Sequence, residues 1–494
     1  MILRGRALPL LGGNRRCYAA GMRKALLACL VAIAVPAAAQ SPAPGDRFVY
    51  QDFAPSAGMP VPEFTLLGAV LTGDQATVRG HAWDLWAALT APSASVVDGQ
   101  RLPVFATWYS IAEVYNPRGK AGVDRRALRH PFKQATQSTL ADSARGGAPA
   151  GLMSFVKLNA ASADFIWSNN YHLTPTLRAL NTQFDRDGTA PVERSIKPFP
   201  ANAMALKLVY WLVKDGKSPQ SERGLTALPV WDPAYPPPPA GGLPMHTSWK
   251  NAVAIDPDGR YPEGTLQQVN VNGTKANPNP TWAPVVSLKR FYAHRLTNAA
   301  DVADARAYTA MMSSAAGEQE RLVTNAGQVP EIGDYIVLLA MHVTTKELDD
   351  WTFQTFWWMP SPHVAPFGGD RPASVRAPFD NYQMCTAYSV VSPRGANGSL
   401  PICFDPYLET DLGPTQPYTM DGKTLPADPM AGTRSNCQNC HRRAAFPAFD
   451  DKAPASANFG RVANDGYRSP DDPYFARLLK VDFMWSIALK NVEP

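Results

Sequence analysis

The segment DYIVLLAMHVTTKELDDWTFQTFWWMP, residues 334–360, carries the clearest secondary-structure pattern in the chain. Its first part, 334–345, is rich in β-branched and apolar residues, which is typical of a strand buried on both faces. Its last part, 351–360, alternates aromatic residues with Thr and Gln before a proline, which also favours a strand. We therefore predict a β-hairpin over residues 334–359, with KELDD at its turn.

Four other segments have apolar patterns that bear on the fold. GHAWDLWAALTA (80–91) and ANAMALKLVYWLV (201–213) suit either a buried helix or a buried strand. VVSLKRFYAHRL (285–296) alternates in part, as a half-buried strand does. Helical periodicity returns in YFARLLKVDFMWSIALKNV (474–492). Strands and helices thus occur in separate parts of one chain, and we predict an α+β fold.

The composition indicates an ordered chain with many loops. Charged residues make up only 18%, which argues against disorder, and 47 prolines favour short elements over long helices. Gly, Pro, Asn and Asp become dense after about residue 370. We therefore predict a large proline-rich mixed body over 40–375, of unassigned function, and a loop-rich, partly helical module over 376–494. The run DPAYPPPPAGG (232–242) suits a linker between domains or a surface loop within one.

The N-terminal residues have the composition of an export signal. Two basic residues precede the short apolar run ALLACLVAIAV, and three consecutive alanines then suit a signal peptidase. We interpret residues 1–39 as a signal peptide with Met22 as the true start, so that the mature chain begins near Gln40. The alternative is a buried N-terminal helix. Export would place the mature protein in the periplasm or outside the cell, where conditions are oxidising.

Removal of the signal would also change the net charge. The full sequence has 47 basic and 42 acidic residues, and six of the basic residues but no acidic residue lie in the predicted signal. This leaves 41 basic against 42 acidic residues, a net charge of about −1. We therefore expect no nucleic-acid or anionic-membrane partner. No apolar run of the mature sequence is long enough to cross a membrane.

SNCQNCHRRAAF, residues 435–446, contains the pattern C-Q-N-C-H. In covalent haem attachment two thiols add to the haem vinyl groups, and two intervening residues let one turn present both sulfurs to the haem edge. The adjacent histidine then ligates the iron. At these residues the chain resembles the c-type cytochromes, and as a whole it is similar to large exported cytochrome c family proteins with a single C-terminal haem motif. The resemblance implies one covalent haem c, thioethers at Cys437 and Cys440, and His441 as the proximal ligand.

Other uses of the four mature cysteines stay open. The four cysteines could together bind zinc, with C-x-x-C as one half of the site. Cys385 and Cys403 are too far apart in sequence to be a second close pair of this kind. A thioredoxin-like dithiol would normally open a helix after a strand, whereas SNCQNC lies in a polar segment. In an oxidising compartment we expect Cys385 and Cys403 to form a disulfide, with two buried thiols as the alternative. We expect this closed loop to help form the wall of the haem site.

The sixth ligand of the iron separates electron transfer from catalysis. Met484, the one methionine after the motif, is a candidate distal ligand or a core residue. An empty or water-filled position is a further alternative. Five histidines of the body compete for this position: His81, His172, His294, His342 and His363. Three arginines are candidate partners of the haem propionates, or else ordinary surface residues: Arg434, Arg442 and Arg443.

Motifs of other enzyme classes are missing from the sequence, including Gly-rich phosphate loops, nucleophile elbows and metalloprotease helices. Trp351, Trp357 and Trp358 suit a core or a substrate slot. We predict a periplasmic c-type cytochrome that exchanges electrons with a redox partner protein or a small molecule. The first alternative is a haem-dependent oxidoreductase, peroxidase-like or dehydrogenating, whose large body binds the substrate. The second is a non-enzymatic binding protein or a zinc-stabilised one.

Overall fold

The structure is a computed structural model that describes most of the chain from residue 47 onward. The segments outside the described part are 1–46, 53–60, 124–154, 235–242, 245–247, 272–277, 304, 306–327, 389–402, 410–417, 421–422, 426–430, 433–436 and 448–468. The predicted signal peptide therefore lies outside the described residues. Residues Ser41–Pro494 form one compact unit.

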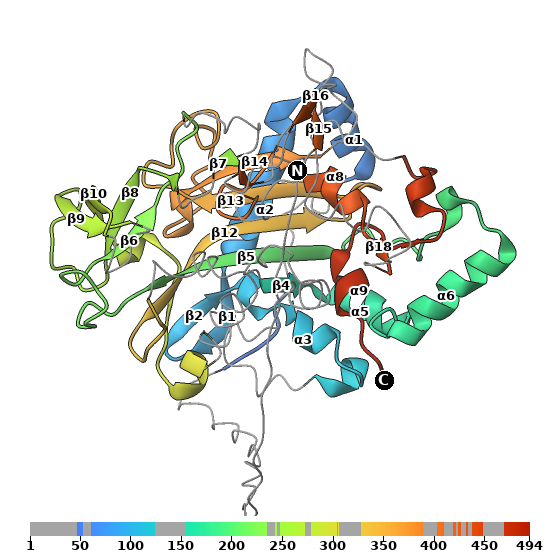
Figure 1. Cartoon of the computed structure of the whole chain (residues 1–494), viewed down its shortest axis with the longest axis horizontal. Helices are drawn as coiled ribbons and strands as arrows, with labels where there is room; N and C mark the ends of the chain where they lie inside the picture. Colours follow the sequence, from blue (N-terminus) through green and yellow to red (C-terminus); the bar gives the residue numbers. More distant parts are fainter. Residues whose placement is uncertain are drawn as a thin grey trace, which may run out of the picture. The chain divides into compact units, whose positions relative to one another are not determined.

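A seven-stranded sheet lies at the centre of this unit (Figure 1). Its strands follow the order β14-β13-β12-β5-β4-β3, and β11 pairs with β12. All of its pairings are antiparallel. In chain order the strands are β3 (Tyr109–Ser110), β4 (Phe155–Leu158), β5 (Met204–Val213), β11 (Ala293–Arg295), β12 (Tyr335–Thr345), β13 (Thr352–Trp358) and β14 (Tyr382–Ala387).

The strands β12 and β13 confirm the predicted hairpin. They pair in antiparallel register from Ala340 opposite Trp357 to Thr345 opposite Thr352. Every residue of β13 is buried, and so are most residues of β12. Both strands are rich in β-branched and aromatic side chains, which pack well when both faces of a sheet are covered.

Separate helices accompany the sheets, so the protein is α+β as predicted. The described helices are α1 (Glu63–Thr72), α2 (Gln75–Thr90), α3 (Ile111–Val114), α5 (Ala160–Ser168), α6 (Thr174–Asp187), α8 (Cys437–Arg442) and α9 (Trp485–Lys490). Short 3-10 helices occupy Val104–Thr107, Gly119–Gly122, Pro191–Glu193, Leu288–Arg290, Phe379–Asn381 and Pro473–Phe475. Among the described helices, none is both long and apolar enough to span a membrane.

Helix α2 covers one face of the main sheet. The ring of Trp86 stacks on Phe356 of β13 with centroids 4.2 Å apart. Its indole N–H donates to the carbonyl of Phe379 at 3.0 Å. All three side chains are buried, so this helix supplies aromatic surface to the core.

Two segments had an apolar pattern that suits either a helix or a strand, and the structure shows one of each. Residues 80–91 fall almost entirely in α2, which begins after Asp74, whose carboxylate accepts from the backbone N–H of Thr77. Residues 201–213 contain the strand β5, which pairs with β12 along its whole length. Both segments are buried, and apolar content alone does not separate a buried helix from a buried strand.

The opposite face of the main sheet is covered by C-terminal segments. Successive side chains of a strand point to opposite faces, so Thr355 and Phe353 point away from α2. The Thr355 hydroxyl donates to Asp405 at 2.7 Å. The ring of Phe353 lies 4.8 Å from that of His441 in α8. Residues 403–409 and α8 therefore lie over this face.

A second sheet of four strands has its own small core. Its order is β6-β8-β10-β9, with β8 and β10 parallel and the other pairs antiparallel. The strands are β6 (Thr226–Pro229), β8 (Ala252–Asp256), β9 (Leu266–Asn270) and β10 (Pro280–Ser287). The prediction of one half-buried strand over 285–296 was wrong. The chain leaves β10 at Ser287, makes a 3-10 turn and enters β11, because here it passes from the second sheet to the main one.

Four two-stranded pairings complete the described sheets. They join β1 to β2, β15 to β16, β7 to β17 and β18 to β19. Their bounds are β1 (Pro92–Val97), β2 (Gln100–Pro103), β7 (Leu243–Pro244), β15 (Tyr418–Met420), β16 (Lys423–Leu425), β17 (Ala431–Gly432), β18 (Ala445–Phe446) and β19 (Leu479–Lys480).

The expected boundary between a body and a C-terminal module, near residue 375, is not a division of the fold. Strand β14 follows this point in the chain and pairs with β13 in the main sheet. Residues on both sides of the boundary belong to the same apolar core, from Ala82 to Ala488. The C-terminal region is therefore part of the body, because it supplies a strand and one covering layer of the main sheet.

The helical pattern over 474–492 does not produce one helix. The chain forms a 3-10 turn, then β19, and only then α9. Asp482 and Phe483 have φ angles of 46° and 66°, in the left-handed region that interrupts a helix. Strand β19 pairs with β18, and this pairing overrides the local apolar spacing.

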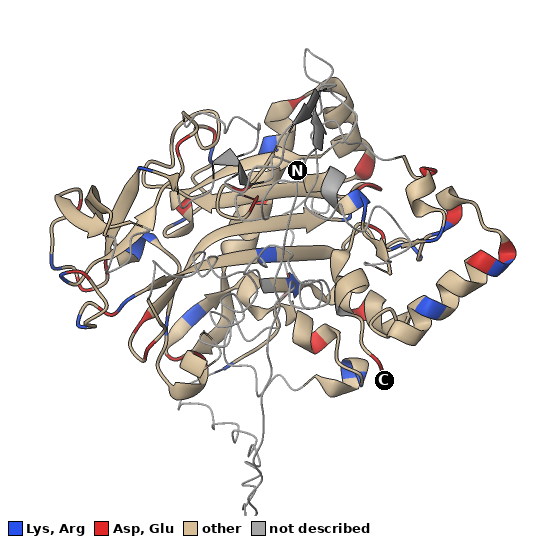
Figure 2. Ribbon diagram, viewed as in Figure 1, with Lys and Arg blue, Asp and Glu red and all other residues tan. Residues whose placement is uncertain are grey.

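Charged side chains are distributed unevenly among the elements (Figure 2). Helix α6 carries both signs along its length. The strands β12, β13 and β14 contain no Lys, Arg, Asp or Glu. Charges that act on the face covered by α8 therefore come from neighbouring strands and from the covering segments.

Candidate functional site

Helix α8 is formed by the C-Q-N-C-H motif itself and is tied to the β12–β13 turn. The amide of Gln438 donates to the carbonyls of Asp350 and Trp351, both at 2.8 Å. Arg442 forms an ion pair with Asp350 at 3.0 Å. Residues four apart lie on one face of a helix, so Cys437 and the histidine of the motif share the same face. This face is turned to the main sheet.

His441 is held in one tautomer. Its Nδ1 lies 2.8 Å from the carbonyl oxygen of Phe483, which can only accept a hydrogen bond, so Nδ1 carries the proton. In the neutral ring the lone pair is then on Nε2. Burial lowers the pKa of His441 to about 3, the hydrogen bond to the Phe483 carbonyl acts against this shift, and the nearby positive charge of Lys207 adds to it. The imidazole therefore stays neutral at physiological pH, as a metal ligand must be.

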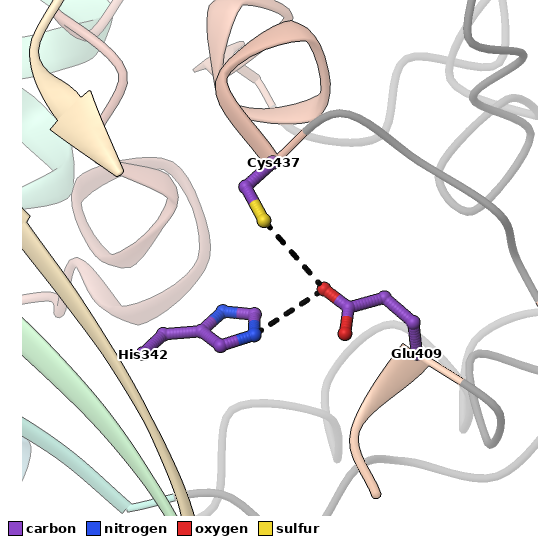
Figure 3. Close-up of side chains that lie close together, drawn as sticks. All are labelled: His342, Glu409 and Cys437. Atoms are coloured by element: carbon purple, nitrogen blue, oxygen red, sulfur yellow. Dashed lines mark hydrogen bonds and ion pairs between the residues drawn. The ribbon is translucent and has the colours of Figure 1, made fainter. Parts of the chain in front are cut away.

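The sulfur of Cys437 lies in a cluster with His342 and Glu409, in which His342 is half-buried and the other two residues are buried (Figure 3). The distance from Cys437 Sγ to Glu409 Oε1 is 3.9 Å, and that from His342 Nε2 to the same oxygen is 3.3 Å. The thiol also lies 3.3 Å from the carbonyl oxygen of Cys403. One ligand atom from each of the three side chains lies within 4.8 Å of the others. Imidazole, carboxylate and thiol thus converge at one point.

The register of the main sheet places His342 in this cluster. Lys207 of β5 lies opposite it on one side and Thr355 of β13 on the other. Cys385 of β14 lies opposite Thr355. Paired residues share a face, so these four side chains form a row across the sheet beneath residues 403–409.

The predicted disulfide between Cys385 and Cys403 is present, with a Cα–Cα distance of 5.7 Å. It joins β14 to the start of the covering segment that carries Glu409. The backbone N–H of Asp405 donates to Glu409 Oε2 at 2.5 Å, which orients the carboxylate. The disulfide removes both cysteines from any four-cysteine zinc site, so that alternative was wrong, and so was the alternative of two buried thiols.

Asp405 adds a second acidic group beside the cluster. Burial, together with the charge of Glu409, raises the pKa of Asp405 to about 7, although His342 and the Thr355 hydroxyl act in the opposite direction. Asp405 is thus partly protonated near neutral pH. Glu409 is the carboxylate that directly contacts the imidazole and the sulfur.

Of the other predicted site residues, some lie outside the described part and the rest are buried or ion-paired. Cys440 lies in α8, but its side chain is outside the described part, as is Arg434. Arg442 is engaged with Asp350 and lies over the ring of Phe483 at 5.7 Å. Arg443 is buried. A role for Arg442 with a haem propionate would therefore compete with its ion pair.

Met484 is a core residue next to the residue that holds His441. It is buried, precedes α9 and directly follows Phe483, whose carbonyl accepts from Nδ1. Its burial in the apolar core favours the core alternative.

Only one of the five candidate body histidines, His342, belongs to the described cluster. His81 lies in α2 and contacts Tyr388 and Glu347 at 2.6 and 3.0 Å. His363 is exposed and contacts Arg371. The others follow α5 or lie in β11: His172 and His294. The three candidate slot tryptophans are at most 1% exposed and belong to the core: Trp351, Trp357 and Trp358.

Sequence reasoning missed Glu409, Gln438 and the carbonyl of Phe483. Glu409 lies 28 residues before Cys437 in a segment without periodicity, so no local pattern marks it. Gln438 is one of the two residues that the motif leaves unspecified. A backbone carbonyl carries no sequence signal at all.

A comparison with protein-family models, curated proteins and solved structures finds no match to this chain.

Proposed function

We propose that the protein is a c-type haem protein that transfers electrons. Cys437 and Cys440 would hold one haem c through thioethers, and His441 would be the proximal iron ligand. The observation that carries the proposal is the hydrogen bond from His441 Nδ1 to the Phe483 carbonyl within a C-x-x-C-H helix. This bond leaves Nε2 as the ligating atom and makes the imidazole more basic toward a metal.

Two further features support this use of α8. Cys437 and His441 lie on one helical face, so a single rigid element presents a thiol and an imidazole together. Phe353 packs against the imidazole ring, which limits the access of water to it. A bound haem supplies an iron that changes its charge by one electron. The chain's part is to orient the imidazole, keep its proton on Nδ1 and restrict water.

The cellular location is part of the same proposal. Covalent haem attachment in bacteria takes place on exported chains, and the N-terminal signal pattern would direct export to the periplasm. The disulfide between Cys385 and Cys403 suits an oxidising compartment. The electron donor and acceptor would be a redox partner protein or a small molecule.

Covalent haem should be retained on the intact chain under denaturing conditions. The protein is produced with a haem-attachment apparatus, and the intact mass and the peroxidase stain of a denaturing gel are measured. We expect one added haem in the wild type and none in the double variant Cys437→Ala/Cys440→Ala, because both thioether bonds are lost. The control Asn439→Ala changes a residue that the motif leaves unspecified and should keep the haem. A wild-type chain without added haem mass would refute the proposal.

Replacing Met484 by leucine should leave the visible spectrum of the haem protein unchanged. Met484 is packed in the apolar core, so we expect that its sulfur is not an iron ligand, and leucine conserves its volume there. Oxidised and reduced spectra of wild type and Met484→Leu make the comparison. A far-red methionine-to-iron band that disappears in the variant would contradict this placement. A high-spin wild-type spectrum that changes on addition of peroxide would replace electron transfer by an oxidoreductase function.

A further inference from the structure

The cluster of His342, Glu409 and Cys437 has the dimensions of a metal site (Figure 3). Bond lengths of zinc to nitrogen, oxygen and sulfur give separations of about 3.4 Å for nitrogen to oxygen and about 3.6 Å for sulfur to oxygen around a tetrahedral ion. The corresponding distances here are 3.3 Å and 3.9 Å. Small side-chain movements would bring all three atoms into one coordination sphere.

The three ligands come from different parts of the fold, with Cys437 at the start of α8. His342 lies on the central strand β12. The second oxygen of Glu409 accepts from the backbone N–H of Asp405, and the Asp405 carboxylate is held in turn by the Thr355 hydroxyl and the backbone N–H of Tyr407. Such outer contacts orient ligands and raise metal affinity.

The charges of the cluster match a divalent ion. A thiolate and a carboxylate carry two negative charges, and a neutral imidazole adds none, so a bound divalent ion gives a net charge of zero. A neutral complex suits this buried position, because an uncompensated charge there would be costly. Lys207 in the same row is a nearby positive side chain of the sheet that opposes cation binding.

We propose that, before haem attachment, the chain binds one divalent ion of the zinc class through Cys437 Sγ, His342 Nε2 and Glu409 Oε1. One sulfur and one nitrogen ligand select Zn²⁺ or Co²⁺ over Mg²⁺ and Ca²⁺, which prefer all-oxygen sites. The ion replaces the thiol proton, which is released to solvent, and no electron is transferred. Three protein ligands leave the fourth position open to water or another donor.

Metal binding and haem attachment would exclude each other at Cys437. A sulfur that has formed a thioether to haem is no longer a thiolate ligand, so attachment would release the ion. This exclusion rests on the proposed haem function, whereas metal binding by the unmodified chain does not. The ion would thus occupy and protect the thiol in the chain that awaits haem.

The test uses the full unmodified chain, made without a haem-attachment apparatus and with its disulfide formed. Co²⁺ is titrated and followed by the thiolate-to-cobalt absorption in the near ultraviolet, and Zn²⁺ is then added to displace it. We expect one ion per chain. Cys437→Ser should remove the absorption, and His342→Ala and Glu409→Gln should weaken binding by at least roughly 100-fold, because outer contacts alone change affinity by about 10- to 100-fold.

Cys440→Ser is the matched control, since it removes a haem attachment point but no ligand of the cluster. It should bind Co²⁺ as the wild type does, with one sulfur donor in X-ray absorption spectra. Circular dichroism and denaturation curves identify any variant that has not folded, and Glu409→Gln, which conserves volume, tests the site independently of cysteine. Equal losses in the two cysteine variants, full binding in Cys437→Ser, or no binding by the wild type would overturn the proposal. None of these results depends on whether the mature chain carries haem.

Discussion

Replacement of Lys214 by methionine should lower the free energy of unfolding by about 3–5 kcal/mol, because it leaves a buried carboxylate without its counter-charge. The Lys214 ammonium is fully buried and lies 2.5 Å from Asp334 Oδ2 and 3.0 Å from Glu331 Oε2. It also donates to the carbonyl of Val329 at 2.7 Å. Asp334 is fully buried as well, and burial already raises the pKa of its carboxyl group. The pair joins the end of β5 to the start of β12.

Chemical denaturation of wild type and Lys214→Met measures the difference in their free energy of unfolding. The double variant Lys214→Met/Asp334→Asn should be more stable than the single one, because the amide keeps an acceptor for the backbone N–H of Asp215 but carries no charge. Lys120→Met is the exposed counterpart. It breaks a 2.7 Å ion pair with Asp164 whose side chains are 65% and 51% exposed, and it should cost less than about 1 kcal/mol. A loss in Lys214→Met as small as that in Lys120→Met would show that the buried pair contributes little.

Local patterns were sufficient for the hairpin and insufficient for its neighbours. The two strands over 334–359 carry separate signals, a run rich in β-branched and apolar residues in the first and alternation of aromatic with polar residues in the second. The edge strand Tyr382–Ala387 is too short, and too close to turn residues, to show any period. Over 474–492 the apolar spacing favoured one helix, but pairing of Leu479–Lys480 with Ala445–Phe446 and two left-handed residues broke it. Non-local pairing decides such short elements.

The candidate site shows the same difference between local and non-local information. The C-Q-N-C-H motif is contiguous, so the order of its residues alone is enough to suggest the haem attachment that we propose. The disulfide was predictable by parity, because four mature cysteines less the two in the motif leave one pair. His342 was only one of five candidate histidines, and sheet register was needed to select it. No sequence pattern marked Glu409 as a site residue, because its position depends on the disulfide and on the backbone of Asp405.

Replacing Cys385 and Cys403 together by serine should lower the free energy of unfolding by about 3 kcal/mol and also weaken metal binding at the cluster. The bond spans 18 residues, and its loss frees the unfolded chain to adopt more conformations. It also anchors the segment that carries Asp405 and Glu409. Co²⁺ affinity of the unmodified chain should therefore fall by roughly tenfold or more, the effect of losing an outer contact that positions a ligand.

The variant Lys214→Met shows whether the loss of metal affinity has a local cause or follows from the loss of stability. It should destabilise the protein by an amount similar to loss of the disulfide, yet it lies outside residues 403–409 and touches no ligand. Under conditions where both variants are folded, Co²⁺ affinity should fall in Cys385→Ser/Cys403→Ser and stay at the wild-type value in Lys214→Met. Unchanged affinity in the disulfide variant would mean that the hydrogen bonds of Asp405 alone position Glu409. Equal losses in both variants would mean that affinity follows global stability, because a ligand that binds only the folded state reports any loss of that state.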